Sequence, residues 1–205
     1  EGCHADLPWN RRCCPRCAAP TEGGRPCGRC LARLPRFDRA VSAMRYEPPV
    51  DRLVLRLKYG LDLAAPRLLG ELTASALAQA DPPDALVPVP LHPARLRQRG
   101  FNQAAELARP VARRLDVPLA TGLCRRTRDT PSQAGLTARQ RRRNLRGAFR
   151  AVAAPPAHVA VMDDVLTTGQ TVEHVAAALR RAGAMRVDVW TCARAAPPDT
   201  PVRTR

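Results

Sequence analysis

The amino-acid sequence predicts an α/β fold, in which helices flank a mostly parallel sheet, with a small cysteine-rich module at the N-terminus. Two observations lead to this fold class. Short apolar runs alternate along most of the chain with longer segments that have apolar residues at helical spacing, and this alternation is typical of a parallel sheet covered by helices. Six of the eight cysteines lie within the first 30 residues.

The cysteines of the N-terminal module form two C-x-x-C pairs separated by nine residues. These pairs are Cys14 with Cys17 and Cys27 with Cys30. Each pair can present two thiolates to one tetrahedral zinc ion, and zinc would supply folding free energy to a segment with few large apolar side chains. The alternative to a zinc site is two disulfides in a secreted protein. Within the zinc site, Cys13 could replace Cys14 as a ligand, and a metal role for Cys3 stays open. We predict a structural Zn²⁺ in a zinc ribbon over residues 1–36.

Residues 37–194 are expected to form the α/β domain, and the Pro-, Ala- and Thr-rich residues 195–205 a disordered tail. Strands are expected at short apolar runs, namely 37–46, 85–89, 117–124, 147–152, 158–162 and 186–192. Helices are expected where apolar residues recur at helical spacing, namely 51–59, 63–80, 101–115 (kinked at Pro110) and 171–181. The arginine-rich segments 91–100 and 125–146 are expected to be loops.

The charge of the chain is concentrated in one segment. Lysine and arginine number 34 against 18 acids, for a net charge of +16, and Lys58 is the single lysine. Residues 91–150 hold 15 arginines and three acids, which predicts a local anionic partner such as phosphate or nucleic acid. No run approaches the roughly 18 apolar residues of a membrane span, so we expect a soluble, cytoplasmic protein without membrane insertion.

The segment HVAVMDDVLTTGQT, residues 158–171, carries the clearest functional motif. An apolar strand is expected to end at Asp163 and Asp164, and a loop of hydroxyls and glycine then leads into a helix. A helix N-terminus offers free N–H groups and a positive dipole end to a phosphate, and two carboxylates can accept hydrogen bonds from the hydroxyls of a ribose. The motif therefore predicts a site for a phosphorylated sugar.

This motif closely resembles the signature of type I phosphoribosyltransferases, which bind 5-phosphoribosyl 1-diphosphate (PRPP). By this resemblance, Asp163 and Asp164 are the catalytic acids that hold the ribose 2′- and 3′-hydroxyls, and Mg²⁺ bridges pyrophosphate and ribose oxygens. The resemblance assigns the 5′-phosphate to Val165, Leu166, Thr167, Thr168, Gly169, Gln170 and Thr171.

Further motifs narrow the resemblance to one family. They are CGRCL (27–31), FDRA (37–40), LKYG (57–60), VPVPLHPARLRQRGFNQA (87–104) and RRTRDTPSQAGLTARQRRRNLRGAF (125–149). With the cysteine pairs, they resemble the ComF family of competence proteins, which combine a zinc ribbon with a type I phosphoribosyltransferase-like domain, over about residues 3–194. The resemblance implies PRPP binding, phosphoribosyl transfer to an unidentified acceptor, and a link to DNA uptake.

The arginines of the two expected loops support two hypotheses. Arg95, Arg97 and Arg99, with Arg141, Arg142 and Arg143, could bind pyrophosphate or a nucleic-acid backbone. The alternative function is therefore a non-catalytic protein that binds single-stranded DNA or a DNA-uptake helicase. Residues 139–146 could also be a solvated helix face, and the aromatic content of 3% offers few platforms for base stacking.

Overall fold

The computed structural model describes residues 2–59, 64–128 and 147–196. A parallel sheet with the strand order β1-β6-β5-β2 forms its centre, and β3 and β4 pair as a small antiparallel ribbon. The strands are β1 (Arg39–Arg45), β2 (Ala85–Pro88), β3 (Cys124–Arg126), β4 (Phe149–Ala151), β5 (His158–Leu166) and β6 (Arg186–Arg194). The helices are α1 (Gly2–Ala5), η1 (Glu22–Gly24), α2 (Gly28–Ala32), α3 (Val50–Tyr59), α4 (Ala64–Leu77), α5 (Pro93–Arg99), α6 (Gln103–Leu115) and α8 (Gln170–Arg181).

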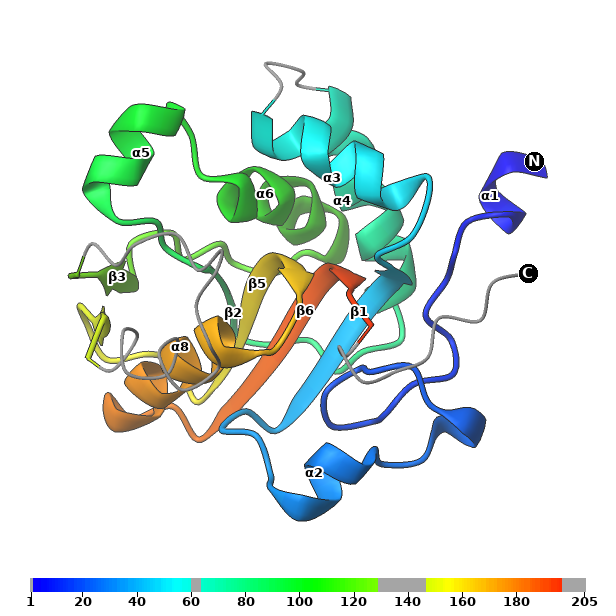
Figure 1. Cartoon of the computed structure of the whole chain (residues 1–205). Coiled ribbons are helices and arrows are strands. Elements are labelled where there is room, and N and C mark those ends of the chain that lie inside the picture. Colours follow the sequence, from blue (N-terminus) through cyan, green and yellow to red (C-terminus); the bar gives the residue numbers. More distant parts are fainter. Residues whose placement is uncertain (1, 60–63, 129–146, 197–205) are drawn as a thin grey trace.

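Helices cover both faces of the sheet, with α4 and α6 on one face, α3 beside α4, and α8 on the opposite face (Figure 1). The strand β5 shows how alternation builds both cores, since Val159 and Val161 belong to the α8 side while Ala160 and Met162 belong to the α4–α6 side. All four side chains are fully buried. The expected parallel sheet flanked by helices is confirmed, and none of the described helices is long and apolar enough to cross a membrane.

The chain leaves β2 and β5 in opposite directions. After β2 and α6 it returns on the outer side of β2, where Leu86 N–H donates to the Pro118 carbonyl and Ala120 N–H donates to the Leu86 carbonyl. After β5 and α8 it returns as β6 on the other side of β5. The boundary between β2 and β5 is therefore the topological switch point, where open α/β sheets bind ligands beyond the carboxyl ends of their strands.

Three expected elements differ from the structure. The strand expected at 117–124 makes a single parallel bridge beside β2, between Leu86 and Leu119, because only this short stretch runs beside the four-residue β2. Its last residue, Cys124, begins β3 instead. The segment 91–100 forms the helix α5 instead of a loop. Its sequence contained both end signals, a proline in the first turn and Gly100 at the C-cap with φ +83°.

The third difference concerns β5, which was expected to end before the acidic pair but continues to Leu166. The reason is that β6 also extends beyond its expected end, to Arg194, and pairs with β5 along this length, with Asp163 opposite Thr191 and Leu166 opposite Arg194. The acidic pair therefore lies within a strand rather than in a flexible loop.

Helix α6 continues through Pro110, and this proline packs against Gly70 of α4. A Cβ atom on Gly70 would lie 2.2 Å from Cγ of Pro110, which is far inside van der Waals contact. Glycine at this position therefore allows the close approach of α4 and α6 that covers one face of the sheet.

The N-terminal segment covers the free edge of the sheet. Asn10 N–H donates to the Ala43 carbonyl at 3.0 Å, and Arg45 N–H donates to the Pro8 carbonyl at 2.7 Å. This antiparallel pairing protects the edge strand β1 from pairing with another chain. It also brings the cysteine-rich segment against the sheet, where Cys14, Cys17 and Cys30 share one apolar core with α8.

Candidate functional site

The acidic pair occupies the carboxyl-terminal part of β5. Because successive side chains of a strand point to opposite faces, the two carboxylates have different surroundings. Asp164 is buried on the α3 side, with 4% of its surface exposed, whereas Asp163 is half-buried. One oxygen of Asp163 accepts a hydrogen bond from the Asp164 N–H at 2.9 Å, which fixes its side chain along the strand.

Lys58, near the end of α3, neutralises the buried member of this pair. Its Nζ lies 2.8 Å from Oδ2 of Asp164. Partial burial opposes the charge of Lys58, but the attraction of Asp164 outweighs it and raises the pKa of the lysine. Sequence reasoning missed this residue as a site residue, although it is the single lysine of the chain and lies in the LKYG motif.

The surroundings of Asp163 affect its ionisation. Burial, followed by the negative charge of Asp164, raises the pKa of Asp163 well above its usual range. Two close carboxylates resist carrying two full negative charges. The structure therefore presents Asp163 as the more exposed carboxylate of the pair, with a raised pKa, while Asp164 is buried and paired with Lys58.

The segment after β5 forms a short turn into α8. Gly169 precedes the helix with φ +81°, a left-handed conformation that glycine adopts without strain. The first N–H groups of α8 have no partner within the helix, and no side chain caps them at Gly169. Thr167 is exposed while Thr168 and Thr171 are half-buried, so backbone donors and hydroxyls border the same end of α8, as anion binding requires.

Two of the residues expected in the phosphate loop are directed elsewhere. The side chain of Leu166 is buried in the core, with 2% exposed, and its carbonyl accepts hydrogen bonds from the Ala195 N–H and from Arg194. Gln170 is also buried. The side chains of these two residues are therefore buried in the protein, whereas Val165 is half-buried.

The loop between β2 and α5 begins beside the acidic pair. Val89 N–H donates to the carbonyl of Met162, the residue before Asp163, at 2.8 Å. The Asn102 side-chain amide holds the Val89 carbonyl at 3.1 Å and caps α6 at Ala104 N–H. The structure thus brings the β2–α5 loop and the acidic pair together at the switch point.

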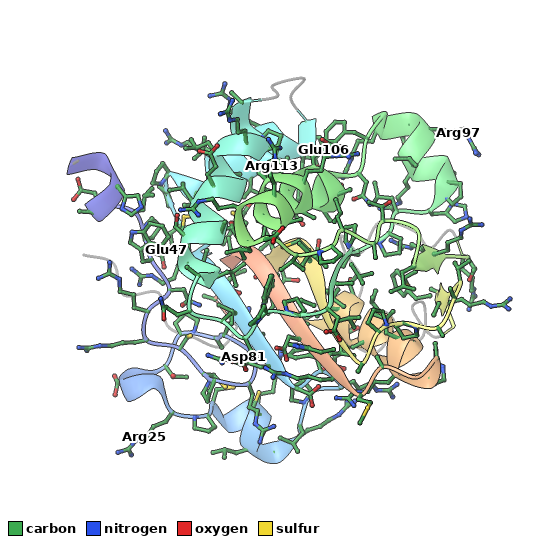
Figure 2. All side chains as sticks on the ribbon, turned by 180° about the vertical axis from the view of Figure 1, so that it is seen from behind. Arg25, Glu47, Asp81, Arg97, Glu106 and Arg113 are labelled. Carbon is green, nitrogen blue, oxygen red and sulfur yellow. The ribbon has the colours of Figure 1, made fainter. Side chains whose placement is uncertain are left out.

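The arginines of α5 do not share one face of the helix. Arg95 and Arg99, four residues apart, lie on the same side, and Arg99 donates to Oε1 of Gln103 at 2.7 Å and stacks 5.8 Å from the ring centroid of Tyr59. Arg97 is exposed and points away from the body of the molecule (Figure 2). His92 caps this helix through Nδ1, which accepts from Ala94 N–H at 3.3 Å. The expected site residues Arg141, Arg142 and Arg143 lie outside the described residues.

The four predicted zinc ligands converge. The Sγ atoms of Cys14, Cys17, Cys27 and Cys30 all lie within 4.8 Å of one another, and those of Cys17 and Cys27 are 3.6 Å apart. A tetrahedral zinc with Zn–S bonds of about 2.3 Å places its sulfurs about 3.8 Å apart. The cysteines are free thiols rather than the alternative disulfides, and Cys13 is not in the cluster. The donor set therefore fits zinc.

The ionisation of these thiols favours a cation at their centre. Burial, together with neighbouring thiols, raises the pKa of Cys17 and of Cys30. Burial also opposes the ionisation of Cys14, but the backbone N–H groups of Cys27, Cys17 and Arg16 outweigh it and lower its pKa to about 7. Four thiolates at this distance repel one another, and a divalent metal that binds thiolates removes the repulsion.

Among the described residues, this cysteine cluster is the one group arranged to hold a metal ion. The acidic pair does not present two free carboxylates, because Lys58 holds Asp164. The described residues therefore do not form a magnesium site by themselves. The predicted Mg²⁺ would have to be bound through the oxygens of a ligand.

The chain is similar to curated bacterial proteins over most of its length. DNA utilization protein YhgH of Escherichia coli (strain K12) is 39% identical over 189 residues, which cover 88% of this chain and 83% of that protein. The protein of the same name from Salmonella typhimurium is 40% identical over the same shares. Competence protein F of Haemophilus influenzae is 36% identical over 179 residues, covering 82% of this chain and 78% of that protein.

No protein-family model matches the chain. Among solved structures, TT1426 from Thermus thermophilus overlaps 66% of this chain and 85% of that chain, with a TM-score of 0.38 and 19% identity. The curated relatives share more than a third of their residues with this chain over more than three-quarters of their own length. The chain therefore belongs to the family of DNA utilization protein YhgH and Competence protein F, the ComF family that its motifs indicate.

Proposed function

We propose that the protein binds PRPP, or another 5-phosphoribosyl ligand, at the carboxyl ends of β5 and β2. The observation that carries this proposal is the continuity of β5, the Thr167–Gly169 turn and α8 at the switch point of the sheet. The turn offers N–H groups to the 5′-phosphate, and the acidic pair lies on the preceding strand, where ribose hydroxyls would donate to it. Arg95 and Arg99 of α5 would face the pyrophosphate.

The residues of the site define what each group would do. Asp163, the more exposed of the two carboxylates, is the acceptor for a ribose hydroxyl. Lys58 offsets the negative charge of Asp164, which would otherwise repel an anionic ligand. Mg²⁺ would accompany the pyrophosphate oxygens. Transfer of the phosphoribosyl group to an acceptor is part of the proposal. The names of the relatives link the family to competence and the utilization of DNA, and we propose that the transfer serves that role.

Thermal unfolding with PRPP tests the proposal. We expect PRPP with magnesium to raise the Tm of the parent protein, because a ligand that binds the native state stabilises it. Asp163→Asn should lose this shift while the Lys58–Asp164 pair stays intact. Asp81→Asn is the matched control, since this exposed carboxylate contacts Arg186 at the opposite, amino-terminal end of the sheet (Figure 2). Absence of any shift in the parent protein contradicts the proposal.

A second candidate function is binding of single-stranded DNA. It is supported by the 15 arginines of residues 91–150 and by relatives named for DNA utilization and for competence. Salt-sensitive binding of an oligonucleotide, followed by fluorescence anisotropy, tests it. We expect simultaneous replacement of Arg141, Arg142 and Arg143 by alanine to weaken binding and to reduce its salt dependence. The control replaces Arg11, Arg12 and Arg25, which are exposed arginines of the N-terminal segment. Equal binding by both triple variants argues against a role for the 141–143 cluster.

A further inference from the structure

The zinc-binding segment is in direct contact with the turn between β5 and α8. Arg29, between the two cysteines of the second pair, donates from Nη2 to the Thr168 carbonyl at 3.0 Å. Arg33, at the end of α2, lies 3.9 Å from the Glu173 carboxylate in the first turns of α8. Residues more than 130 positions apart in the sequence are thereby joined.

Arg194 makes the same connection from the core. It is the last residue of β6 and only 1% of its surface is exposed. Its Nε donates to the carbonyl of Cys17 at 3.0 Å. Its Nη1 donates to the carbonyls of Leu166 and Thr167 at 2.8 and 2.7 Å. One buried guanidinium thus binds the backbone of a zinc ligand and the backbone of the turn, and a buried charge is stable only with such partners.

These contacts set the direction of the peptide groups in the turn. The carbonyls of Leu166, Thr167 and Thr168 all point toward a guanidinium of Arg194 or Arg29. In a trans peptide unit the N–H points opposite to the carbonyl. The N–H groups of the next residues, Thr167 to Gly169, are therefore turned away from the two arginines and are available to an anion.

From this arrangement we propose that Arg29 and Arg194 are positioning residues for the anion-binding turn, and that they couple zinc binding to ligand binding. Zinc fixes the segment that carries Cys17 and Arg29, and through it the carbonyls of the turn. Conversely, a phosphate bound by the Thr167–Gly169 turn stabilises the zinc-bound segment. Such coupling is reciprocal, because each ligand must change the affinity of the other by the same factor. The inference rests on the proposed function for the identity of the ligand.

The Arg29 contact can be tested without disturbing the core, because Arg29 is exposed. We expect Arg29→Ala to retain one zinc per chain but to raise the Kd for PRPP with magnesium about fivefold or more, a typical coupling between sites, as measured by isothermal titration calorimetry. The matched control is Arg25→Ala, since Arg25 belongs to the same segment but points outward from it (Figure 2). Equal affinities of the two variants would overturn the positioning role.

The reciprocal effect is measured on the metal. We expect PRPP with magnesium to slow the release of zinc to a colorimetric chelator severalfold in the parent protein, and inorganic phosphate to do so at higher concentration. Arg29→Ala should reduce this protection, whereas Arg25→Ala should keep it. Far-UV circular dichroism confirms that both variants are folded.

The outcomes separate this inference from the proposed function. If PRPP raises Tm but does not slow zinc release, and if Arg29→Ala binds PRPP as tightly as the parent protein, the coupling is wrong and the phosphoribosyl site stands. If inorganic phosphate slows zinc release but PRPP gives no further effect, the coupling stands and the phosphoribosyl ligand is wrong. If neither phosphate nor PRPP changes Tm or zinc release, both are wrong.

Discussion

The ammonium of Lys58 lies 2.8 Å from Oδ2 of Asp164 and so joins the end of α3 to the carboxyl-terminal part of β5. The next residue, Tyr59, stacks beneath the guanidinium of Arg99 in α5. Lys58 and Tyr59 therefore lie between the acidic pair and an arginine that follows the neighbouring strand β2. This connects the two segments that we propose as the halves of the ligand site.

Replacing Lys58 should weaken both folding and ligand binding. Removing one partner of a fully buried ion pair costs about 3–5 kcal/mol. A quarter of the Lys58 side chain is exposed, so we expect Lys58→Met to lose a smaller amount, about 2 kcal/mol, in chemical denaturation. The unpaired carboxylate of Asp164 should also repel PRPP. We expect the Kd for PRPP to rise about fivefold or more, which corresponds to the loss of one favourable charge interaction.

Charge and packing are separated by two further variants. Lys58→Arg keeps the positive charge and should recover most of the affinity that Lys58→Met loses. Arg52→Met removes an exposed cation from the same helix, six residues earlier, and should behave like the parent protein. An affinity in Lys58→Met equal to that of Arg52→Met would show that Lys58 does not serve the ligand.

Asp163 should limit the stability of the unliganded protein at neutral pH. The pKa of Asp163 is raised in the folded state. Its contribution to folding stability is therefore fully present below the unfolded-state pKa of about 3.9 and is lost as the pH rises through the folded-state pKa. Asp163→Asn cannot ionise and keeps an oxygen for the Asp164 N–H. We expect this variant to have a Tm higher by about 3 °C at pH 7 and equal to the parent at pH 4.

Differential scanning fluorimetry between pH 4 and pH 8, without ligand, measures this difference. The same substitution removes the proposed ribose acceptor, so a gain in stability would accompany a loss of PRPP binding, as is common at functional sites. A Tm difference that does not change with pH would mean that the ionisation of Asp163 has no part in it.

Zinc should contribute to folding through the four clustered cysteines and not through Cys13. We expect Cys30→Ser to lose the metal and to unfold at least 10 °C below the parent protein, because a structural zinc supplies several kcal/mol of folding free energy. Cys13→Ser should retain one zinc per chain, as measured by native mass spectrometry. Metal loss in Cys13→Ser would assign a ligand role to that cysteine instead.

The contact between α4 and α6 should require glycine at position 70. A Cβ on Gly70 would overlap the ring of Pro110, so we expect Gly70→Ala to cost about 1–3 kcal/mol through overpacking. Gly28→Ala is the control, because a Cβ there has open space. Pro110→Ala removes Cγ of Pro110, the atom nearest to a Cβ at position 70. The double variant Gly70→Ala with Pro110→Ala should therefore be more stable than the sum of the two single effects predicts. Strict additivity in urea unfolding would contradict this steric account.

Local pattern was sufficient for much of the fold. Helical spacing located α3, α4 and α8 within a few residues, and the cysteine spacing identified all four members of the cysteine cluster that fits zinc. Pattern failed where a neighbouring element decided the outcome. The acidic pair stays in a strand because β6 pairs with it. Residues 117–123 make only the bridge at Leu119 because β2 beside them is short.

The sequence by itself determined which residues can do chemistry, since the acidic pair, the glycine-containing turn and the cysteine pairs are local motifs. Only the tertiary structure decided their partners. Lys58 meets Asp164 across more than 100 residues, and Arg194 reaches Cys17 across 177. The physical reason is that motifs depend on the geometry of neighbouring residues along the chain, whereas ion pairs and buried hydrogen bonds depend on which elements the packed sheet brings together.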